Sequence, residues 1–161
     1  MRRFLVALLL VAFVPARAGA AVPWLLPVHG PVVRGFLAPV TPYGPGHFGV
    51  HFAVPPGTPV RAASAGMVSF VGKVNGVLYV VVRHPGDLRT TYGFLASTPV
   101  HDRDRVTQGQ VLGTTRGPIL HFGLRRGDEY LDPMQLFRPP RVELAPLDRP
   151  ERPPSSAGGR G

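Results

Sequence analysis

The sequence contains no cysteine among its 161 residues. This absence excludes disulfide bonds, thiolate metal ligands, a cysteine nucleophile and a lipid-modified cysteine. Charged residues are few, at 17%, whereas hydrophobic residues make up 44%, enough to build a buried core in most of the chain. No Ser-His-Asp triad, phosphate-binding glycine loop or pair of catalytic carboxylates occurs at a usable spacing.

The sequence also lacks an apolar run long enough to span a membrane. Phe4–Val14 is uncharged and apolar, but it has eleven residues, and a membrane-spanning helix needs about 20. The run follows Arg2 and Arg3 and precedes Ala18-Gly19-Ala20, which is the pattern of a signal peptide over residues 1–20. We therefore expect a secreted or cell-wall protein without a transmembrane segment in its mature form. A retained N-terminal anchor is the alternative.

Acidic residues are in the minority, and the formal net charge of the whole chain is +9. Without Arg2, Arg3 and Arg17 of the leader, 15 basic and 9 acidic residues remain, a net charge of +6. The basic residues are scattered and do not alternate with aromatic residues, so we expect no nucleic-acid partner. A basic exported protein is suited to an anionic cell-wall polymer. Solubilising charge explains the arginines equally well.

Glycine and proline are abundant, with 20 of each, and many separate short apolar runs, where they are typical of turns. We expect an all-β, mostly antiparallel domain of the barrel or sandwich kind over residues 46–137, with at most a turn or two of helix near residues 132–137. A proline-rich lead-in over residues 21–45 precedes it, and a disordered tail over residues 138–161 follows. The predicted strands are Pro59–Ala63, Met67–Val71, Leu78–Arg83, Thr90–Leu95, Val111–Thr114 and Leu120–Leu124.

Two histidines, His47 and His51, lie four residues apart among several glycines and prolines. On a helix this spacing is typical of zinc sites, but the prolines make a helix implausible. On a straight strand the two residues would lie roughly 13 Å apart, too far for a shared metal ion. A bend at Gly49 would bring them together. From spacing alone, a metal site and an ordinary pair of histidines both remain open.

Five blocks of sequence follow one another along the chain. The first is residues 47–60, HFGVHFAVPPGTPV. The others are Ala62, Gly66 and Val68; His84 with Thr91-Tyr92; residues 106–113, VTQGQVLG; and Leu120-His121-Phe122 with Leu124-Arg125 and Asp132-Pro133. In this order they resemble the motifs of the LytM/lysostaphin-type zinc metalloendopeptidases, whose signature H-x-G-x-D-x-x-x-P-x-G-T-P-V is similar to the first block. The resemblance runs from Gly46 to about Phe137, most of the mature chain, and is nearest to the short arginine-, alanine- and proline-rich forms of actinobacteria.

The resemblance implies an exported β-domain that holds zinc in a cleft and cuts peptide cross-links of peptidoglycan. Carried over position by position, the metal ligands are His47, His51 and His121, with His51 in the place of the family aspartate. Three neutral imidazoles also hold zinc in known sites. The implied cofactor is therefore zinc, although loss of the carboxylate weakens retention of the ion.

Two family positions that move protons are apolar in this chain. Ile119 stands where the family has a histidine two residues before the last ligand, and Phe94 stands where it has a second one. Neither side chain can take up a proton, so we expect a degenerate active site without catalytic residues. Tyr92 and His84 are candidate assistants; their ordinary interpretations are a core tyrosine and a turn-stabilising histidine.

Three functions follow from this reading. In the first, a monomeric, non-catalytic domain binds peptidoglycan or a cell-wall hydrolase. In the second, the chain is an active zinc-dependent peptidoglycan endopeptidase with an unusual three-histidine site. In the third, it is an exported β-domain whose cleft no longer has a specific role. The absence of proton-transfer groups favours the first.

Overall fold

The computed structural model describes residues 23–38 and 44–138. The predicted signal peptide and the predicted tail beyond Arg138 lie outside these residues. Within the described ranges, no helix is long and apolar enough to cross a membrane.

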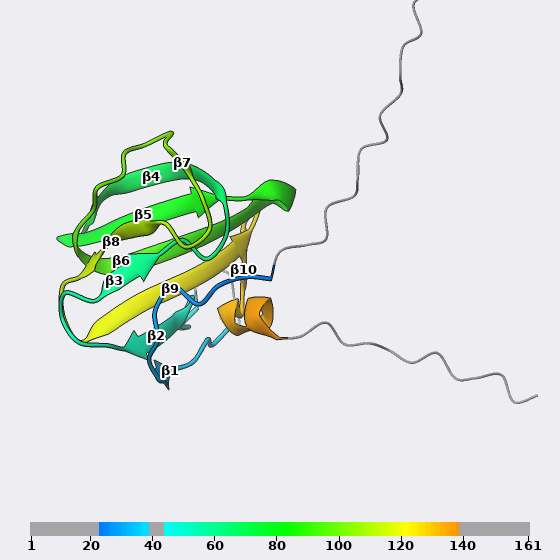
Figure 1. Ribbon diagram of the computed structural model, residues 1–161. Coiled ribbons are helices and arrows are strands. Elements are labelled where there is room, and N and C mark those ends of the chain that lie inside the picture. Colours follow the sequence, from blue (N-terminus) through cyan, green and yellow to red (C-terminus); the bar gives the residue numbers. More distant parts are fainter. Residues whose placement is uncertain (1–22, 39–43, 139–161) are drawn as a thin grey trace, which may run out of the picture.

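The described chain forms one antiparallel sheet with two short 3-10 helices (Figure 1), which confirms the all-β prediction. The main path of the sheet has the order β1-β2-β9-β6-β5-β4-β7, while β10 pairs with β9, and β8 joins β3 to β6. The elements are β1 (Val32–Arg34), β2 (Val50–Ala53), β3 (Pro59–Arg61), β4 (Gly66–Val74), β5 (Val77–Arg83), η1 (Pro85–Asp87), β6 (Leu88–Ser97), β7 (Arg105–Val106), β8 (Val111–Thr115), β9 (Ile119–Arg126), β10 (Glu129–Leu131) and η2 (Pro133–Phe137).

All six strands predicted from the sequence are present as β3, β4, β5, β6, β8 and β9. The hairpin between β4 and β5 turns at Asn75 and Gly76, whose φ angles of 50° and 78° are the left-handed pair that a two-residue hairpin turn requires. The helical turn expected near the end of the domain is η2, where the Asp132 carboxylate accepts a hydrogen bond from the Met134 backbone N–H at 3.0 Å.

Four further strands were not predicted. β1 lies in the proline-rich lead-in, β2 contains His51, and β7 and β10 have only two and three residues. The described part of the lead-in is packed against the domain, since Val28 is buried and Trp24 contacts the core. Residues 23–38 therefore belong to the same structural unit as the strands that follow.

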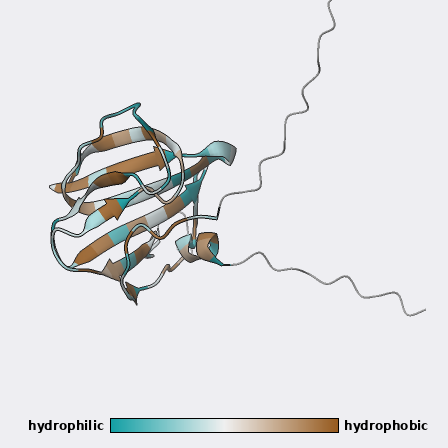
Figure 2. Ribbon diagram, in the orientation of Figure 1, coloured by the Kyte–Doolittle hydropathy of each residue, from teal (hydrophilic) through white to brown (hydrophobic). Residues whose placement is uncertain are grey.

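The core lies on one face of the sheet and is built from alternate residues of its strands. Figure 2 shows apolar residues along the central strands and hydrophilic residues at many of the turns that join them. The largest fully buried side chains include Phe52, Tyr92, Leu112, Leu120 and Phe122. The other face carries the histidines and the arginines described below.

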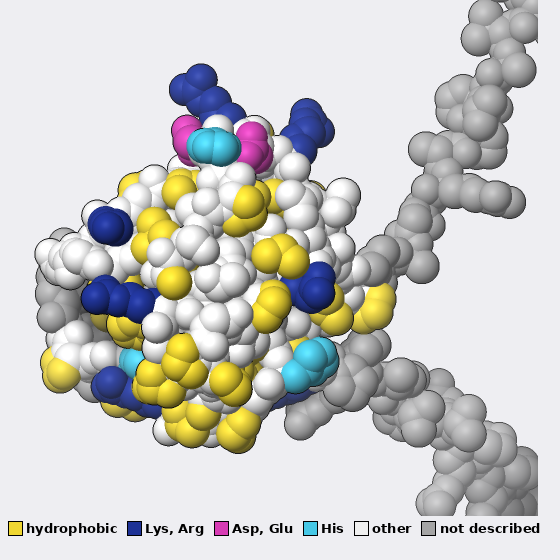
Figure 3. Space-filling view, turned by 60° about the vertical axis from the view of Figure 1, so that its left-hand side comes forward, with side chains coloured by type: hydrophobic (Ala, Val, Ile, Leu, Met, Phe, Trp, Pro, Cys, Tyr) yellow, Lys and Arg dark blue, Asp and Glu magenta, His cyan; other side chains and the backbone are white. Residues whose placement is uncertain are grey.

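Charge on the surface is unevenly distributed. In the view of Figure 3, the acidic side chains gather at the top of the molecule beside basic ones, whereas Lys and Arg also occur elsewhere on that face. The loop between β6 and β7 lies at the top of Figure 1, and it contains Asp102, Arg103 and Asp104. The Arg103 Nε lies 3.7 Å from the Asp102 carboxylate and both side chains are exposed, which agrees with the solvated face expected of alternating charges.

Candidate metal centre

Three histidines from two strands and one loop converge at one end of a cleft. His51 on β2 lies directly opposite His121 on β9 in the antiparallel register, so their side chains leave the same face of the sheet. His47 precedes β2, and its backbone pairs with that of Leu37 through two hydrogen bonds. The ring nitrogens offered by the three residues lie within 4.8 Å of one another.

Gly49 explains how His47 can approach His51. The chain bends at this residue, as the sequence predicted, but the reason is close packing and not an unusual backbone angle. A Cβ atom at this position would lie 2.5 Å from the Phe122 carbonyl oxygen and 2.7 Å from Cε1 of His121. Only glycine lets the bend pass so close to the third histidine.

The orientation of His47 leaves one ring nitrogen free to bind a cation. Its Nδ1 donates to the Gly35 carbonyl at 2.8 Å, so Nε2 carries the lone pair. Nε2 of His47 lies 3.0 Å from Nε2 of His51. A backbone carbonyl that fixes the tautomer of an imidazole is the usual outer partner of a metal-binding histidine.

Two of these imidazoles, His51 and His121, have surroundings that favour the neutral form. Burial, followed by the neighbouring His51 and His47, lowers the pKa of His121 to about 4. The pKa of His51 is also lowered, mainly by burial and then by His47 and Arg34. A metal ion binds the neutral form of histidine, so the two groups need lose no proton near neutral pH.

The donor set fits zinc. Bonds of 2.0–2.1 Å in a tetrahedral site place the ligand atoms roughly 3.3 Å apart, and the pair His47–His51 is already at 3.0 Å. The three rings stand edge to face, with centroids 4.3–5.7 Å apart, so their nitrogens point to a shared centre without stacking. Three imidazoles with one position left open are the ligand arrangement of known catalytic zinc sites.

The two apolar residues at the family's proton-transfer positions flank this centre. The Phe94 ring stands edge-on to the His51 ring, with centroids 5.6 Å apart. Ile119 is two residues before His121 on β9 and so shares its face of the strand. With His51, these residues line an apolar pocket of about 440 Å³. The other residues that line it are Val77, Arg116, Gly117 and Pro118, and none of these side chains is suited to act as a general base.

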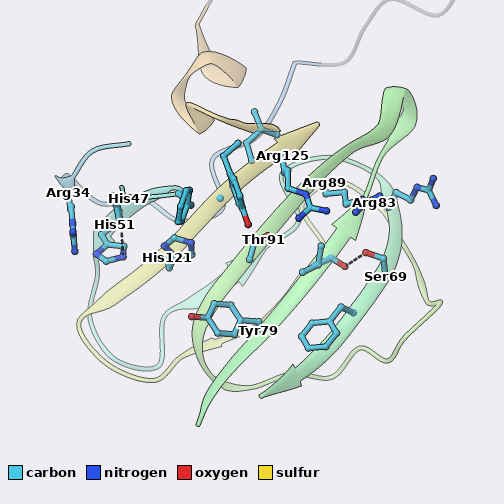
Figure 4. A pocket seen from close by; sticks show the side chains of 16 residues that line it. Arg34, His47, His51, Ser69, Tyr79, Arg83, Arg89, Thr91, His121 and Arg125 are labelled. Atoms are coloured by element: carbon cyan, nitrogen blue, oxygen red, sulfur yellow. Dashed lines mark hydrogen bonds between the residues drawn. The ribbon is translucent and has the colours of Figure 1, made fainter. Parts of the chain in front are cut away.

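A larger cleft of about 780 Å³ begins at the three histidines and runs along the sheet (Figure 4). Tyr79 lies in it, and its ring covers Gly93, where a Cβ atom would come within 2.4 Å of the ring. The Tyr79 and His121 ring centroids are 6.5 Å apart. Neither Tyr79 nor the arginines of the cleft were identified as site residues from the sequence. Because alternate residues of a strand share a face, the sequence of β5 does predict that Tyr79 lies on the same face as Val81 and Arg83.

Tyr92 and His84 lie elsewhere, in the core. The Tyr92 side chain is fully buried and its hydroxyl accepts from the Ala63 N–H at 2.9 Å. His84 Nδ1 donates to the Ala65 carbonyl at 2.8 Å, which leaves Nε2 to accept from the Thr90 hydroxyl, also at 2.8 Å. The hydroxyls of Thr90 and Tyr92 are 3.1 Å apart. Neither Tyr92 nor His84 lines the cleft, so their contacts support the ordinary structural interpretations.

This buried chain of hydrogen bonds predicts an acid-sensitive contribution to stability. Burial lowers the pKa of His84 below its ordinary 6.5. The unfolded chain therefore takes up a proton at a higher pH than the folded chain, and the free energy of unfolding falls as the pH drops below about 6.5. In urea titrations between pH 8 and pH 4.5, we expect His84→Asn to be less stable than the native protein at pH 8. Its free energy of unfolding should also fall less steeply as the pH is lowered.

The matched control for this prediction is His101→Asn, because the His101 side chain is 87% exposed. We expect this variant to follow the native pH dependence. A decline in His84→Asn as steep as in the native protein would show that His84 does not contribute.

The structure combines an antiparallel β-domain with a histidine cluster at one end of an open cleft, which is the arrangement that the sequence resemblance to zinc metallopeptidases implies. Residues 45–133 match the family model described as Peptidase family M23. The match covers more than half of the 161 residues, and the chain belongs to this family. The resemblance to LytM-type endopeptidases seen in the sequence is thereby confirmed.

Several curated proteins are similar to the chain. An uncharacterized protein of Mycobacterium tuberculosis is 35% identical over 140 residues, covering 77% of this chain and 54% of that protein. The DD-carboxypeptidase/endopeptidase Mpg of Neisseria meningitidis is 31% identical, covering 64% of this chain and 25% of Mpg. The peptidoglycan DD-endopeptidase ShyC of Vibrio cholerae is 38% identical, covering 53% of this chain and 22% of ShyC. The chain thus spans about half of the mycobacterial relative and a quarter or less of the other two.

Solved structures agree on the fold. A zinc-containing peptidase from Vibrio cholerae has a TM-score of 0.59 at 28% identity, covering 71% of this chain and 39% of that one. The catalytic domain of a prophage-encoded M23 protein from Enterococcus faecalis has a TM-score of 0.54 at 29% identity, covering 67% and 94%. The second match shows that an isolated M23 catalytic domain has about the extent of the β-domain described above.

Proposed function

We propose that this chain is an exported M23 domain of the cell wall that binds zinc and peptidoglycan but hydrolyses the polymer slowly or not at all. The observation that supports this most directly is the pairing of a convergent three-histidine cluster with apolar side chains at the two proton-transfer positions. The metal ligands are His47, His51 and His121. Phe94 and Ile119 fill the places from which a base would act.

A zinc ion held there would polarise a peptide carbonyl and lower the pKa of a water molecule. The residues of this chain must supply everything else. General acid–base groups contribute about 10²–10⁴-fold each, and Phe94 and Ile119 have no proton to give or accept. The cleft itself is intact, since it is open, about 780 Å³ in volume, and begins at the histidines. Binding without efficient cleavage is the function that these features support best.

An active zinc endopeptidase is the second candidate. Tyr79 supports it, because its ring lies beside His121 and its phenol faces the cleft (Figure 4). A phenol can donate a hydrogen bond to a developing oxyanion. The likeness to peptidases that are named for peptidoglycan cleavage supports it as well.

Peptidoglycan co-sedimentation and zymography on purified cell wall, each with and without added zinc, test the proposal. We expect the native protein to sediment with peptidoglycan and to give no clear zone. Thr91 lies on the floor of the cleft, so Thr91→Trp should reduce binding at least about tenfold by filling it. Val74→Trp is the matched control, because Val74 is exposed at the last position of β4 and does not line the cleft. A zinc-dependent clear zone from the native protein would promote the second candidate.

A further inference from the structure

Three arginines stand side by side across three neighbouring strands. Arg83 on β5 lies directly opposite Arg89 on β6, and Arg89 lies directly opposite Arg125 on β9. All three line the cleft (Figure 4); we call them the arginine row. Like charges in directly opposite positions destabilise a sheet. Folding alone therefore gives no reason to place three guanidinium groups next to one another.

Among the described residues, the carboxylates near the arginine row offset its charge only in part. Asp87 Oδ1 lies 3.8 Å from Arg83 and 3.4 Å from Arg89, and Asp128 Oδ1 lies 3.4 Å from Arg125. Both aspartates are exposed, Asp128 fully, so these pairs are weak. Among the described residues that line the cleft there is no Asp or Glu. The arginine row thus has spare capacity for an anion.

The register of the sheet sets the distance between the arginine row and the metal centre. Across the cleft floor, directly paired residues of β9, β6 and β5 form rows. From the metal centre outward, the first row is His121, Gly93 and Tyr79, the second is Gly123, Thr91 and Val81, and the third is Arg125, Arg89 and Arg83. His121 and Arg125 are four residues apart on one strand, which corresponds to roughly 13 Å. Small side chains in the middle row leave room for a chain lying along the cleft.

We propose that the arginine row binds a carboxylate of a peptide that lies along the cleft, about four residues from the peptide bond at the histidines. The distance follows from the chain itself, because an extended peptide also advances about 3.3–3.6 Å per residue. The proposal rests on the proposed function, in which the cleft holds the peptide part of peptidoglycan. It adds the chemical class of the group that is recognised and its position.

Among anions, a carboxylate is the ligand best suited to the arginine row. The guanidinium group matches the two oxygens of a carboxylate in a planar, forked geometry. The row already accepts one from the protein, since Asp87 contacts both Arg83 and Arg89. The cleft runs without a break from the arginines to the histidine cluster of a peptidase family, and the anionic group that a peptide carries is a carboxylate.

Matched peptides test this proposal on the full chain. Octapeptides of glycine and alanine with blocked termini carry one glutamate at successive positions, each with a glutamine counterpart, and binding is measured by fluorescence anisotropy at constant salt. At one position of the charged residue, we expect the glutamate peptide to bind at least about tenfold more tightly than its glutamine counterpart, as hydrogen bonds to charged groups allow. Arg89→Gln and Arg125→Gln should reduce this preference to about twofold or less, without lowering the melting temperature.

The control variant is Arg103→Gln. Arg103 is also paired with an aspartate, but it is 90% exposed on the loop between β6 and β7, outside the cleft. It should keep the preference for glutamate. Equal binding of glutamate and glutamine peptides at every register would overturn the proposal, and so would a preference that survives in Arg89→Gln and Arg125→Gln. If inorganic phosphate displaces the peptides and no preference for glutamate is seen, the arginine row binds phosphate, and this result would overturn the proposal as well.

Failure of this proposal and failure of the proposed function give different results. If the native protein binds peptidoglycan while glutamate and glutamine peptides bind alike, the carboxylate site is wrong and the proposed function stands. If glutamate binding depends on Arg89 and Arg125 while peptidoglycan does not bind, the carboxylate site stands and the proposed function is wrong.

Discussion

Restoring three residues is expected to convert the protein into a peptidoglycan hydrolase. The triple variant carries His51→Asp, Phe94→His and Ile119→His. Because each general acid or base contributes about 10²–10⁴-fold, hydrolysis of purified peptidoglycan should rise at least about 10⁴-fold over the native protein in the presence of zinc. Release of soluble fragments measures it.

The backbone is already suited to both new histidines. Phe94 has a φ angle of 64°, a left-handed conformation that histidine adopts more readily than most residues. Ile119 shares its face of β9 with His121, so a histidine there would point toward the metal centre. His51→Asp alone should stay near background. A control with His51→Asp, Phe94→Leu and Ile119→Leu separates proton transfer from changes in packing.

Strong zinc-dependent hydrolysis by the native protein would contradict this prediction, because it would show that Phe94 and Ile119 do not limit catalysis. In that case Tyr79→Phe becomes the informative variant. It removes the phenol that faces the cleft and keeps the ring against Gly93.

Removing one histidine is expected to abolish zinc retention. In His121→Ala the site keeps two imidazoles, and zinc affinity should fall by more than about 100-fold, since even the loss of an outer-shell partner costs 10–100-fold. His51→Asp should retain zinc more strongly than the native protein, because a carboxylate offsets the charge of the ion. Metal content after dialysis, and competition with a chromophoric chelator, measure both effects.

His101→Ala is the control for this comparison, since its side chain is 87% exposed on the loop that carries Asp104. Equal zinc content in the native protein and in His121→Ala would show that these histidines do not form a metal site. The pH dependence is a second check. Because the pKa values of His51 and His121 are lowered, protons compete less well for these ligands, and zinc should persist below pH 6.5.

Local sequence patterns were sufficient to predict the fold class and most of the strands. Short β-prone runs separated by Gly, Pro and Asn allow little besides an antiparallel sheet, and the turn at Asn75-Gly76 depends on two adjacent residues only. The ordered motifs around His47 and His121 identified the family, which the match over residues 45–133 confirms. The weak strands were missed because β1, β7 and β10 have three residues or fewer and exist through their partners.

Only the tertiary structure decided which side chains share a site. His51 and His121 are 70 positions apart, and the register between β2 and β9 sets them opposite each other. The same register separates Tyr92, which faces the core, from Gly93, which lies beside His121. A shift of one residue would exchange the two faces of the strand.

The arginine row has the same origin. Arg83, Arg89 and Arg125 are scattered in the sequence, which left binding of an anionic wall polymer and solubilising charge equally open, but strand pairing places them in one line. By itself, the sequence determined the fold class, most of the strands, the family and the residue types available for chemistry, because these depend on neighbouring residues and ordered motifs. The composition of the cleft was decided by long-range pairing, because residues on three strands become neighbours only when the sheet has formed.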